Sequence, residues 1–568
     1  MLPNGAEASS PPSRWVIGPV AQAQLATLGV FALLSGWLLS AKGLVLATTV
    51  HDAYVIMDAT WRMALGEIVH RDFHSPIGQA FFWPLLLLTH LGDVSATTIV
   101  HASVLVGLLL LILGWLALPG RLSPFAMFAM ITLVLTTALT PRDIGWGPTV
   151  ILSNLAPYNR WGWSFLLLAA TIALVPRIRP AALVDGLVLG LCCSVLLYLK
   201  ISYGLAALGL VGLGVIGRAV TLRTVLTTLF TVLAVAGLVE MLAHNNAFYL
   251  ADLAAAARAN TGRLVDVAKL ERHLAEGLGY WLLDCALLWC LRPTRSPRAF
   301  VGMWAYPLLA TAALTVGGAL LAMQNHPFWE CPLFLGGGIV AWELGRREAG
   351  RTFSIPPKRL VPLVALVTIG AYPVLLDFSA IRLASRRSQN GWACRMEALA
   401  GGFGRNLMLS ARAFPEREPG RGVVQPCASA DDDMTVTTYR DGERLEFEAA
   451  RLQAALALLH RVAGPHDRIM ALEFGNPYPA FTGTLPPDGS LLWWDAGRSF
   501  SAAAHPDPVR LFNSTTVVLQ ERYPASETPD SIAVLFWQIY GPDIERKFVR
   551  VAVTQYWTVW KRRLPSPS

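Results

Sequence analysis

Residues 21–76 decide how this chain is interpreted, because an apolar run, AQAQLATLGVFALLSGWLLSAKGLVLAT (21–48), leads into a charged segment. That segment places Asp52 a few residues past the run, then a short amphipathic stretch, WRMALGE (61–67), and a turn, RDFHSP (71–76). A helix that crosses a bilayer needs about 20 apolar residues, so the run is long enough. Ionisable groups this close to a membrane are costly and are usually retained for a function. The stretch therefore predicts a membrane protein with chemistry in the loop after its first span.

The composition extends this interpretation to most of the chain. Of the 568 residues, 54% are hydrophobic and only 15% are charged, and the mean hydropathy is +0.47. These values exclude an ordinary soluble enzyme. Apolar runs predict about eleven membrane spans, at 21–48, 96–118, 125–140, 161–176, 181–199, 203–217, 224–242, 277–291, 300–322, 328–344 and 360–377.

Lysine and arginine in the short loops predict the orientation, because cytoplasmic loops carry an excess of both. With the N-terminus in the cytoplasm, most of these residues fall on the cytoplasmic side, at Arg121, Arg177, Arg179, Arg218, Arg223, Arg292, Arg295, Arg298, Arg346, Arg347, Arg351, Lys358 and Arg359. An odd number of spans then places everything after about Phe378 outside the cytoplasm. The net charge of +8 reflects this bias and not a nucleic-acid footprint. The first 20 residues lack a basic start, so no cleavable signal peptide is expected.

Three parts are expected: a disordered cytoplasmic tail (1–20), an all-α polytopic membrane domain (21–377) and a small extracytoplasmic, periplasmic α/β domain (378–568). Long outer loops at 49–95, 141–160 and 243–276 are where function tends to collect. In the last part, a stripe of leucines predicts a helix from Glu443 to His460. Short runs rich in β-branched and aromatic residues predict strands at 469–474, 515–519, 532–537 and 548–553.

The seven cysteines divide between the two domains. Five lie in predicted spans and are interpreted as small apolar packing residues, namely Cys192, Cys193, Cys285, Cys290 and Cys331. Cys394 and Cys427 lie in the outer domain, where an oxidising compartment permits a disulfide, and the sequence leaves open whether their geometry suits one. The chain has no CxxC or HExxH pattern, so no structural zinc is indicated.

The stretch around Asp52 resembles the first extracytoplasmic loop of the GT-C superfamily of membrane glycosyltransferases, in architecture the protein O-mannosyltransferase or aminoarabinose transferase type. The resemblance implies inverting transfer of a sugar from a polyprenyl-phosphate-linked donor to a glycan, lipid or protein acceptor. In the family an acidic residue just past the first span removes the proton of the acceptor hydroxyl, and Asp52 matches that position. Members often show Asp-Glu or a lone Asp here; this chain has His51-Asp52, with His51 a candidate substrate contact. The alternative is that Asp52 caps the helix that follows.

Four further residues of this loop are candidates for substrate binding. Asp58 and Arg62 lie four residues apart on one helix face, and a simple helical salt bridge worth a few tenths of a kcal/mol also explains them. Asp72 and His74 correspond to the segment that lines the donor cavity in the family. The alternative for Asp72 and His74 is that they order their own turn.

The other loops supply acids and cations. Asp143 is the acid of the second outer loop, where the family commonly carries one, and an ion pair with Arg142 is the alternative. A lipid phosphate needs positive charge. Lys200 and Arg160 are predicted to lie on the outer side, where cations break the positive-inside bias, and they are candidates for that role. Snorkelling to the membrane interface explains them equally well.

A polar patch at 324–330 resembles one that some GT-C members place late in the membrane domain. Gln324, His326 and Glu330 are therefore candidates for contact with the donor, with a buried polar turn as the alternative. Oxygen ligands such as Asp52 and Asp143 would favour Mg²⁺ or Mn²⁺, and several family members need no metal, so a cofactor stays open.

Two other classes of function remain in view. A transporter or flippase for a lipid-linked saccharide would place polar residues within several spans, and a non-catalytic scaffold would use the outer domain to bind partners. In that domain Trp493 and Trp494 suit stacking on sugar rings, although such residues are more often core. The composition favours a bacterial inner membrane.

Overall fold

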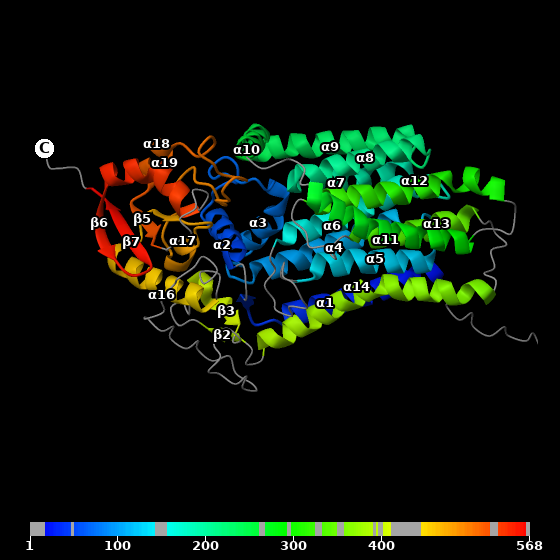
Figure 1. Ribbon diagram of the computed structural model, residues 1–568, viewed down its shortest axis with the longest axis horizontal. Coiled ribbons are helices and arrows are strands. Elements are labelled where there is room, and N and C mark those ends of the chain that lie inside the picture. The colour runs from blue at the N-terminus through cyan, green and yellow to red at the C-terminus, as the bar shows by residue number, and fades with distance from the viewer. Residues whose placement is uncertain are drawn as a thin grey trace, which may run out of the picture.

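The computed structural model describes residues 18–46, 50–141, 156–260, 267–291, 297–323, 332–348, 357–389, 393–395, 402–410, 445–522 and 532–563. Figure 1 shows a long bundle of helices at one end of the molecule and a small α/β unit at the other, with α2 and α3 between them. The bundle is built from α1 (Pro19–Leu39), α4 (Thr98–Ala117), α5 (Pro124–Leu139), α6 (Pro157–Leu174), α7 (Ala182–Leu199), α8 (Ile201–Ile216), α9 (Leu222–Ala243), α11 (Val267–Leu291), α12 (Pro297–Ala322), α13 (Pro332–Glu348) and α14 (Pro357–Gln389).

Each bundle helix overlaps one of the predicted spans. Within the described residues, six are long and apolar enough to cross a membrane, namely α1, α4, α7, α9, α11 and the part of α12 from Trp304 to Ala322. The shorter α5 and α8 are also apolar. The chain is therefore an integral membrane protein in its architecture, and the number of eleven crossings stays a prediction.

Close helix packing is clearest between α7 and α9. A Cβ on Gly186 or Gly190 would approach the side chain of Thr227 or Thr231 to 2.4 or 2.5 Å. Glycines four residues apart let the two backbones approach, as is common in membrane helices. Elsewhere on its surface α9 exposes large apolar side chains such as Phe230, which suits contact with lipid.

The predicted ends of the first and last spans need correction. The first helix ends at Leu39, and the apolar residues after it form β1 (Leu44–Leu46), which pairs in parallel with β3 (Leu407–Ser410). β3 also pairs antiparallel with β2 (Ala393–Arg395), and η3 (Gly402–Asn406) precedes it. The last helix continues to Gln389, twelve residues past the predicted end, and Ile381 in this extension is fully buried.

The C-terminal unit (445–563) has one four-stranded sheet, in the order β4-β5-β7-β6. Only β4 and β5 are parallel. Its elements are α16 (Leu445–Val462), β4 (Ile469–Leu472), α17 (Tyr478–Thr482), α18 (Pro508–Ser514), β5 (Val517–Glu521), α19 (Ile532–Lys547), β6 (Phe548–Val553) and β7 (Trp557–Arg562).

One predicted strand of this unit is wrong. Residues 532–537 begin the helix α19, and its side chains Phe536, Tyr540 and Ile544, four residues apart, are fully buried in one apolar cluster with Trp494. The β-branched and aromatic run favoured a strand locally, but this helical spacing covers the core. The strand β7 was not predicted.

Four cysteines of the membrane domain are described, and two of them, Cys285 and Cys290 of α11, are only partly buried. Cys192 and Cys193 are fully buried in α7, and no disulfide involves them. Cys394 lies in β2, but its side chain and all of Cys427 lie outside the described residues, so their disulfide stays a prediction.

Candidate functional site

The predicted loop 49–95 forms the junction between the bundle and the C-terminal unit. It contains α2 (Val50–Ala64), η1 (Gln79–Phe81) and α3 (Trp83–His90). The Trp61 indole donates to the Thr484 carbonyl at 2.9 Å, and the backbone amide of His74 donates to Ser490 O at 2.9 Å. These contacts join segments more than 400 residues apart, so the loop and the C-terminal unit form one surface.

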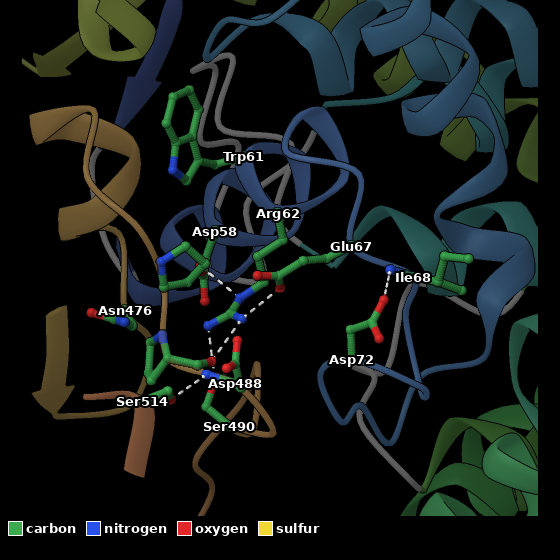
Figure 2. Close-up of polar contacts among 12 residues, drawn as sticks. Asp58, Trp61, Arg62, Glu67, Ile68, Asp72, Asn476, Asp488, Ser490 and Ser514 are labelled. Atoms are coloured by element: carbon green, nitrogen blue, oxygen red, sulfur yellow. Dashed lines mark hydrogen bonds and ion pairs between the residues drawn. The ribbon is translucent and has the colours of Figure 1, made fainter. Parts of the chain in front are cut away.

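Arg62 lies at the centre of this junction (Figure 2). Its guanidinium donates to Asp58 Oδ1 at 3.0 Å, to Glu67 Oε2 at 2.9 Å and to Ser490 Oγ at 2.8 Å. It also donates to the Pro487 carbonyl at 3.2 Å. The salt bridge predicted between Asp58 and Arg62 is confirmed, but both side chains are 0% exposed, so the surface value of a few tenths of a kcal/mol does not apply.

Burial governs the charge of this cluster. It raises the pKa of Asp58 to about 7, because desolvation and the nearby Glu67 outweigh the attraction of Arg62. Burial likewise raises the pKa of Glu67. Two acids therefore share one guanidinium inside the protein. Direct contact with a substrate would require exposure that Asp58 and Arg62 lack here, and their role in binding stays a prediction.

Asp52 is the third residue of α2, in its first turn, and is partly buried. The alternative interpretation of Asp52 made it the N-cap residue of this helix. Because the helix begins at Val50, Asp52 lies within it and is not the N-cap residue. A carboxylate in the first turn is stabilised by the helix dipole. The backbone of His51 also belongs to α2, but its side chain lies outside the described residues.

Asp72 orders its own turn. It pairs with Arg71 at 3.0 Å and accepts from the Ile68 amide at 2.7 Å. Partial burial opposes ionisation, but these hydrogen bonds outweigh it and hold the pKa of Asp72 below its usual value. The structural alternative for Asp72 is thus realised, and a contact with donor stays a prediction.

His74 is held by a residue that the sequence analysis did not select. Its Nδ1 lies 2.7 Å from Oδ1 of Asp252, and Nδ1 of His70 lies 2.7 Å from Oδ2 of the same carboxylate. Asp252 belongs to α10 (Asn246–Ala259), in the third predicted outer loop. An acid in an alanine-rich helix just past a span was the signal available in the sequence.

Lys200 is the single residue between α7 and α8, and its extended backbone (φ −160°) breaks the two helices. Its ammonium lies 5.9 and 5.8 Å from the ring centres of Tyr158 and Tyr203 and 3.5 Å from Asn159 Oδ1. Among the described residues, no carboxylate pairs with it. Desolvation lowers the pKa of Lys200 to about 8, helped by repulsion from Arg498.

Donors without partners lie beside this ammonium. In the described part of the chain, the buried Asn159 Nδ2 and Ser202 Oγ have no hydrogen-bond partner. The N-terminus of α8, which begins at Ile201, adds the positive end of a helix dipole. Together these groups are suited to an anion.

Aromatic residues connect this cluster to the C-terminal unit. The ring of Trp493 lies 6.1 Å from that of Tyr158 and 5.9 Å from that of Phe474. By contrast, Trp494 is 0% exposed within the core of the unit. Trp494 is therefore a core residue, as the alternative interpretation proposed, whereas Trp493 lies at the junction.

The remaining candidates are only partly described. Arg160 is buried in the first turn of α6. Asp143, Gln324, His326 and Glu330 lie outside the described residues. No group of three or more potential metal ligands occurs in the described ranges, which omit Asp143, so a metal stays open.

No protein-family model matches the chain, and no curated protein sequence matches it. Among solved structures, the chain is similar to the crystal structure of ArnT from Cupriavidus metallidurans bound to undecaprenyl phosphate. The match covers 94% of this chain and 97% of that one, with 12% identity and a TM-score of 0.44. At this identity and TM-score the match carries no argument about the fold or the function of this chain.

Proposed function

We propose that this protein is an integral-membrane glycosyltransferase that transfers a sugar, with inversion, from a polyprenyl-phosphate-linked donor to a glycan, lipid or protein acceptor. The reaction takes place on the outer face of a bacterial inner membrane, the side on which the C-terminal unit lies. One observation carries the proposal: Lys200 has no carboxylate partner among the described residues.

A cation in such surroundings needs compensation. Ion pairs that lose one partner inside a protein leave an uncompensated charge, which is strongly destabilising. The ammonium of Lys200 and the amide of Asn159 offer charge and a donor to the same small volume. A phosphate at the end of a membrane-embedded polyprenyl chain has the matching charge, and the break between α7 and α8 lies at the end of two apolar helices.

The reaction follows from these groups. The oxygen of the acceptor hydroxyl forms a bond to the anomeric carbon, and the bond from that carbon to the phosphate oxygen breaks. The lipid phosphate leaves with the electron pair and is stabilised by Lys200, with Arg498 nearby. Asp52, at the first turn of α2, takes the proton of the hydroxyl. Inversion results because the acceptor attacks opposite to the leaving phosphate.

The test uses the full-length protein, purified into lipid nanodiscs, and a panel of polyprenyl-phosphate sugars. Wild type is compared with Asp52→Asn and Lys200→Met, and release of polyprenyl phosphate is measured. Turnover of one donor that both substitutions remove supports the proposal. Equal turnover in a folded Asp52→Asn protein would refute the role of Asp52.

A transporter of a lipid-linked saccharide is the second candidate, because α11 carries ionisable residues inside the bundle. His273 and Asp284 are 2% and 4% exposed, and a Cβ on Gly337 of α13 would lie 2.7 Å from Asp284 Oδ2. Such residues within a span often mark a path for ions or protons. Translocation of labelled lipid without turnover of any donor would favour this candidate.

A further inference from the structure

A cavity of about 550 Å³ lies where α10, the turn at 74–76 and the segment 491–506 of the C-terminal unit meet. Figure 1 shows α10 at this junction, beside the ends of the bundle helices. Alanines of α10 and of residues 503–504 form much of its wall, and the polar lining includes His74, Asp252, Arg258, Ser499 and His505. The cavity is thus roomy enough for a sugar-sized ligand.

The chemistry of this cavity is set by Asp252. Its carboxylate accepts from Nδ1 of His74 and Nδ1 of His70, both at 2.7 Å, and from the backbone amide of Ser75 at 3.0 Å. Burial opposes ionisation, but the two histidine hydrogen bonds outweigh it and hold the pKa of Asp252 below its usual value. An ionised carboxylate only accepts, so each histidine carries its proton on Nδ1.

This arrangement leaves Nε2 as the ring nitrogen of His74 that is not bonded to Asp252. The ring of His74 is 26% exposed and lines the cavity, whereas His70 is fully buried and its Nε2 has no partner among the described residues. His70 is packed against the Tyr249 ring at 4.9 Å and takes a left-handed backbone (φ 71°). His70 therefore supports the carboxylate, and His74 presents the group to the cavity.

The backbone holds His74 firmly. Its amide donates to Ser490 O and its carbonyl accepts from the Leu492 amide, both at 2.9 Å. Four residues later, the Gly78 amide donates to Leu199 O at 3.0 Å, next to Lys200. The cavity and the proposed phosphate site are therefore connected by one short, hydrogen-bonded segment.

We propose that this cavity binds the neutral, hydroxyl-bearing end of the acceptor, a saccharide, and that a ligand hydroxyl donates to Nε2 of His74. That the bound saccharide is the acceptor of the reaction rests on the proposed function, whereas the binding of a neutral saccharide in this cavity does not. The ligand is neutral overall because the lining contributes one carboxylate, Asp252, and one guanidinium, Arg258, whose charges are opposite. Asp252 lines the cavity and, through its hydrogen bond to Nδ1, acts as a positioning residue for His74.

Footprinting with diethyl pyrocarbonate tests the binding directly, because the reagent modifies an unprotonated, accessible imidazole nitrogen. The full-length protein in nanodiscs is treated with the reagent alone, with methyl glycosides of glucose, galactose and mannose, and with inorganic phosphate. Modified histidines are mapped by peptide mass spectrometry. We expect His74 to react and to be protected by at least one methyl glycoside but not by phosphate.

His101 is the matched control. Its Nδ1 lies 2.6 Å from Asp93 Oδ2 and its side chain is 34% exposed, so its chemistry resembles that of His74, but it does not line the cavity. We expect His101 to react equally in every sample. Protection of His74 by phosphate, no protection by any glycoside up to its solubility limit, or no reaction at His74 would each overturn the proposal.

Kinetics separate this inference from the proposed function. If wild type turns over a donor, we expect His74→Ala to raise the KM for acceptor about fivefold, the value of one neutral hydrogen bond, with a smaller effect on the KM for donor. His74→Gln, which keeps an acceptor atom, should recover part of the loss, and His101→Ala should change neither constant. An unchanged KM for acceptor in His74→Ala refutes the assignment. Absence of all donor turnover in wild type refutes the proposed function and leaves the footprint to decide the saccharide site.

Discussion

Replacing Lys200 by methionine should stabilise the protein and weaken its binding of polyprenyl phosphate. Methionine has nearly the same length and no charge, so the substitution removes the ammonium and keeps the packing. A lysine that serves only the fold would give the opposite result for stability. The two changes of opposite sign therefore identify Lys200 as a residue that serves a ligand.

The magnitude follows from the surroundings of Lys200. The decrease of its pKa from 10.5 to about 8 corresponds to about 3 kcal/mol spent on keeping the ammonium charged in the fold. The substitution also removes the two cation–π contacts of the ammonium with the rings of Tyr158 and Tyr203, and each lost contact reduces this gain in stability by about 1 kcal/mol. The net gain is about 1 kcal/mol, or a rise in Tm of about 1–2 °C. Loss of a charged hydrogen bond should weaken phosphate binding about 10- to 100-fold.

The pH dependence gives an independent check. The pKa of Lys200 is lower in the folded protein than in the unfolded chain, so the unfolded chain binds more protons between pH 8 and pH 10.5. The stability of wild type should therefore rise with pH in this window relative to that of Lys200→Met. Lys200→Met should therefore be more stable than wild type by its full margin below about pH 8. This margin should decrease as the pH increases toward 10.5.

Thermal unfolding between pH 7 and pH 10 measures the first effect, and native mass spectrometry with polyprenyl phosphate measures the second. Lys42→Met is the control, because Lys42 is exposed and should change neither quantity. A Lys200→Met protein that is less stable at every pH and binds the lipid as tightly as wild type would refute the reasoning.

Three further substitutions test other parts of the site. Asp52→Asn should lower transfer about 10²- to 10⁴-fold with donor binding and Tm nearly unchanged, and activity close to wild type would rule out Asp52 as the base. Arg62→Met should destabilise the protein by about 3–5 kcal/mol, because it leaves the buried Asp58 and the partly buried Glu67 without their cation. Thermal unfolding measures this loss of stability. Adding Asp58→Leu to the Arg62→Met protein should restore part of it. An Arg62→Met protein as stable as wild type would contradict the role of the ion pairs between Arg62 and the two acids. Gly78→Ala should cost about 1–3 kcal/mol, because a Cβ there would lie 2.0 Å from the carbonyl oxygen of Tyr198, and an unchanged Tm would show that the segment moves freely.

Much of the architecture was predictable because membrane helices follow a local rule. About 20 apolar residues in sequence suffice to mark a span, so every predicted range overlaps a bundle helix. Lys200 was a candidate for the same reason, since a lysine between two apolar runs is visible in the sequence. The helix α16 was also predicted, from its stripe of leucines.

Local patterns failed where neighbours in space decided the outcome. Residues 532–537 satisfy the composition of a strand, yet burial at every fourth position makes them the start of α19. The length of α14 likewise depended on packing of residues such as Ile381 beyond the apolar run. Trp494, which shares the apolar cluster of α19, lies outside a sequence window that covers 532–537.

The sequence by itself determined that this is a membrane protein, where most of its helices lie and that chemistry-bearing residues gather in its loops. Only the tertiary structure decided which of them act together. Arg62 meets Ser490, 428 residues away, and His74 meets Asp252, 178 residues away. It also decided that Lys200 lies beside Asn159 with no carboxylate among the described residues. Hydrophobicity is a property of neighbouring residues and can be read along the chain, whereas charge compensation depends on contacts that only folding creates.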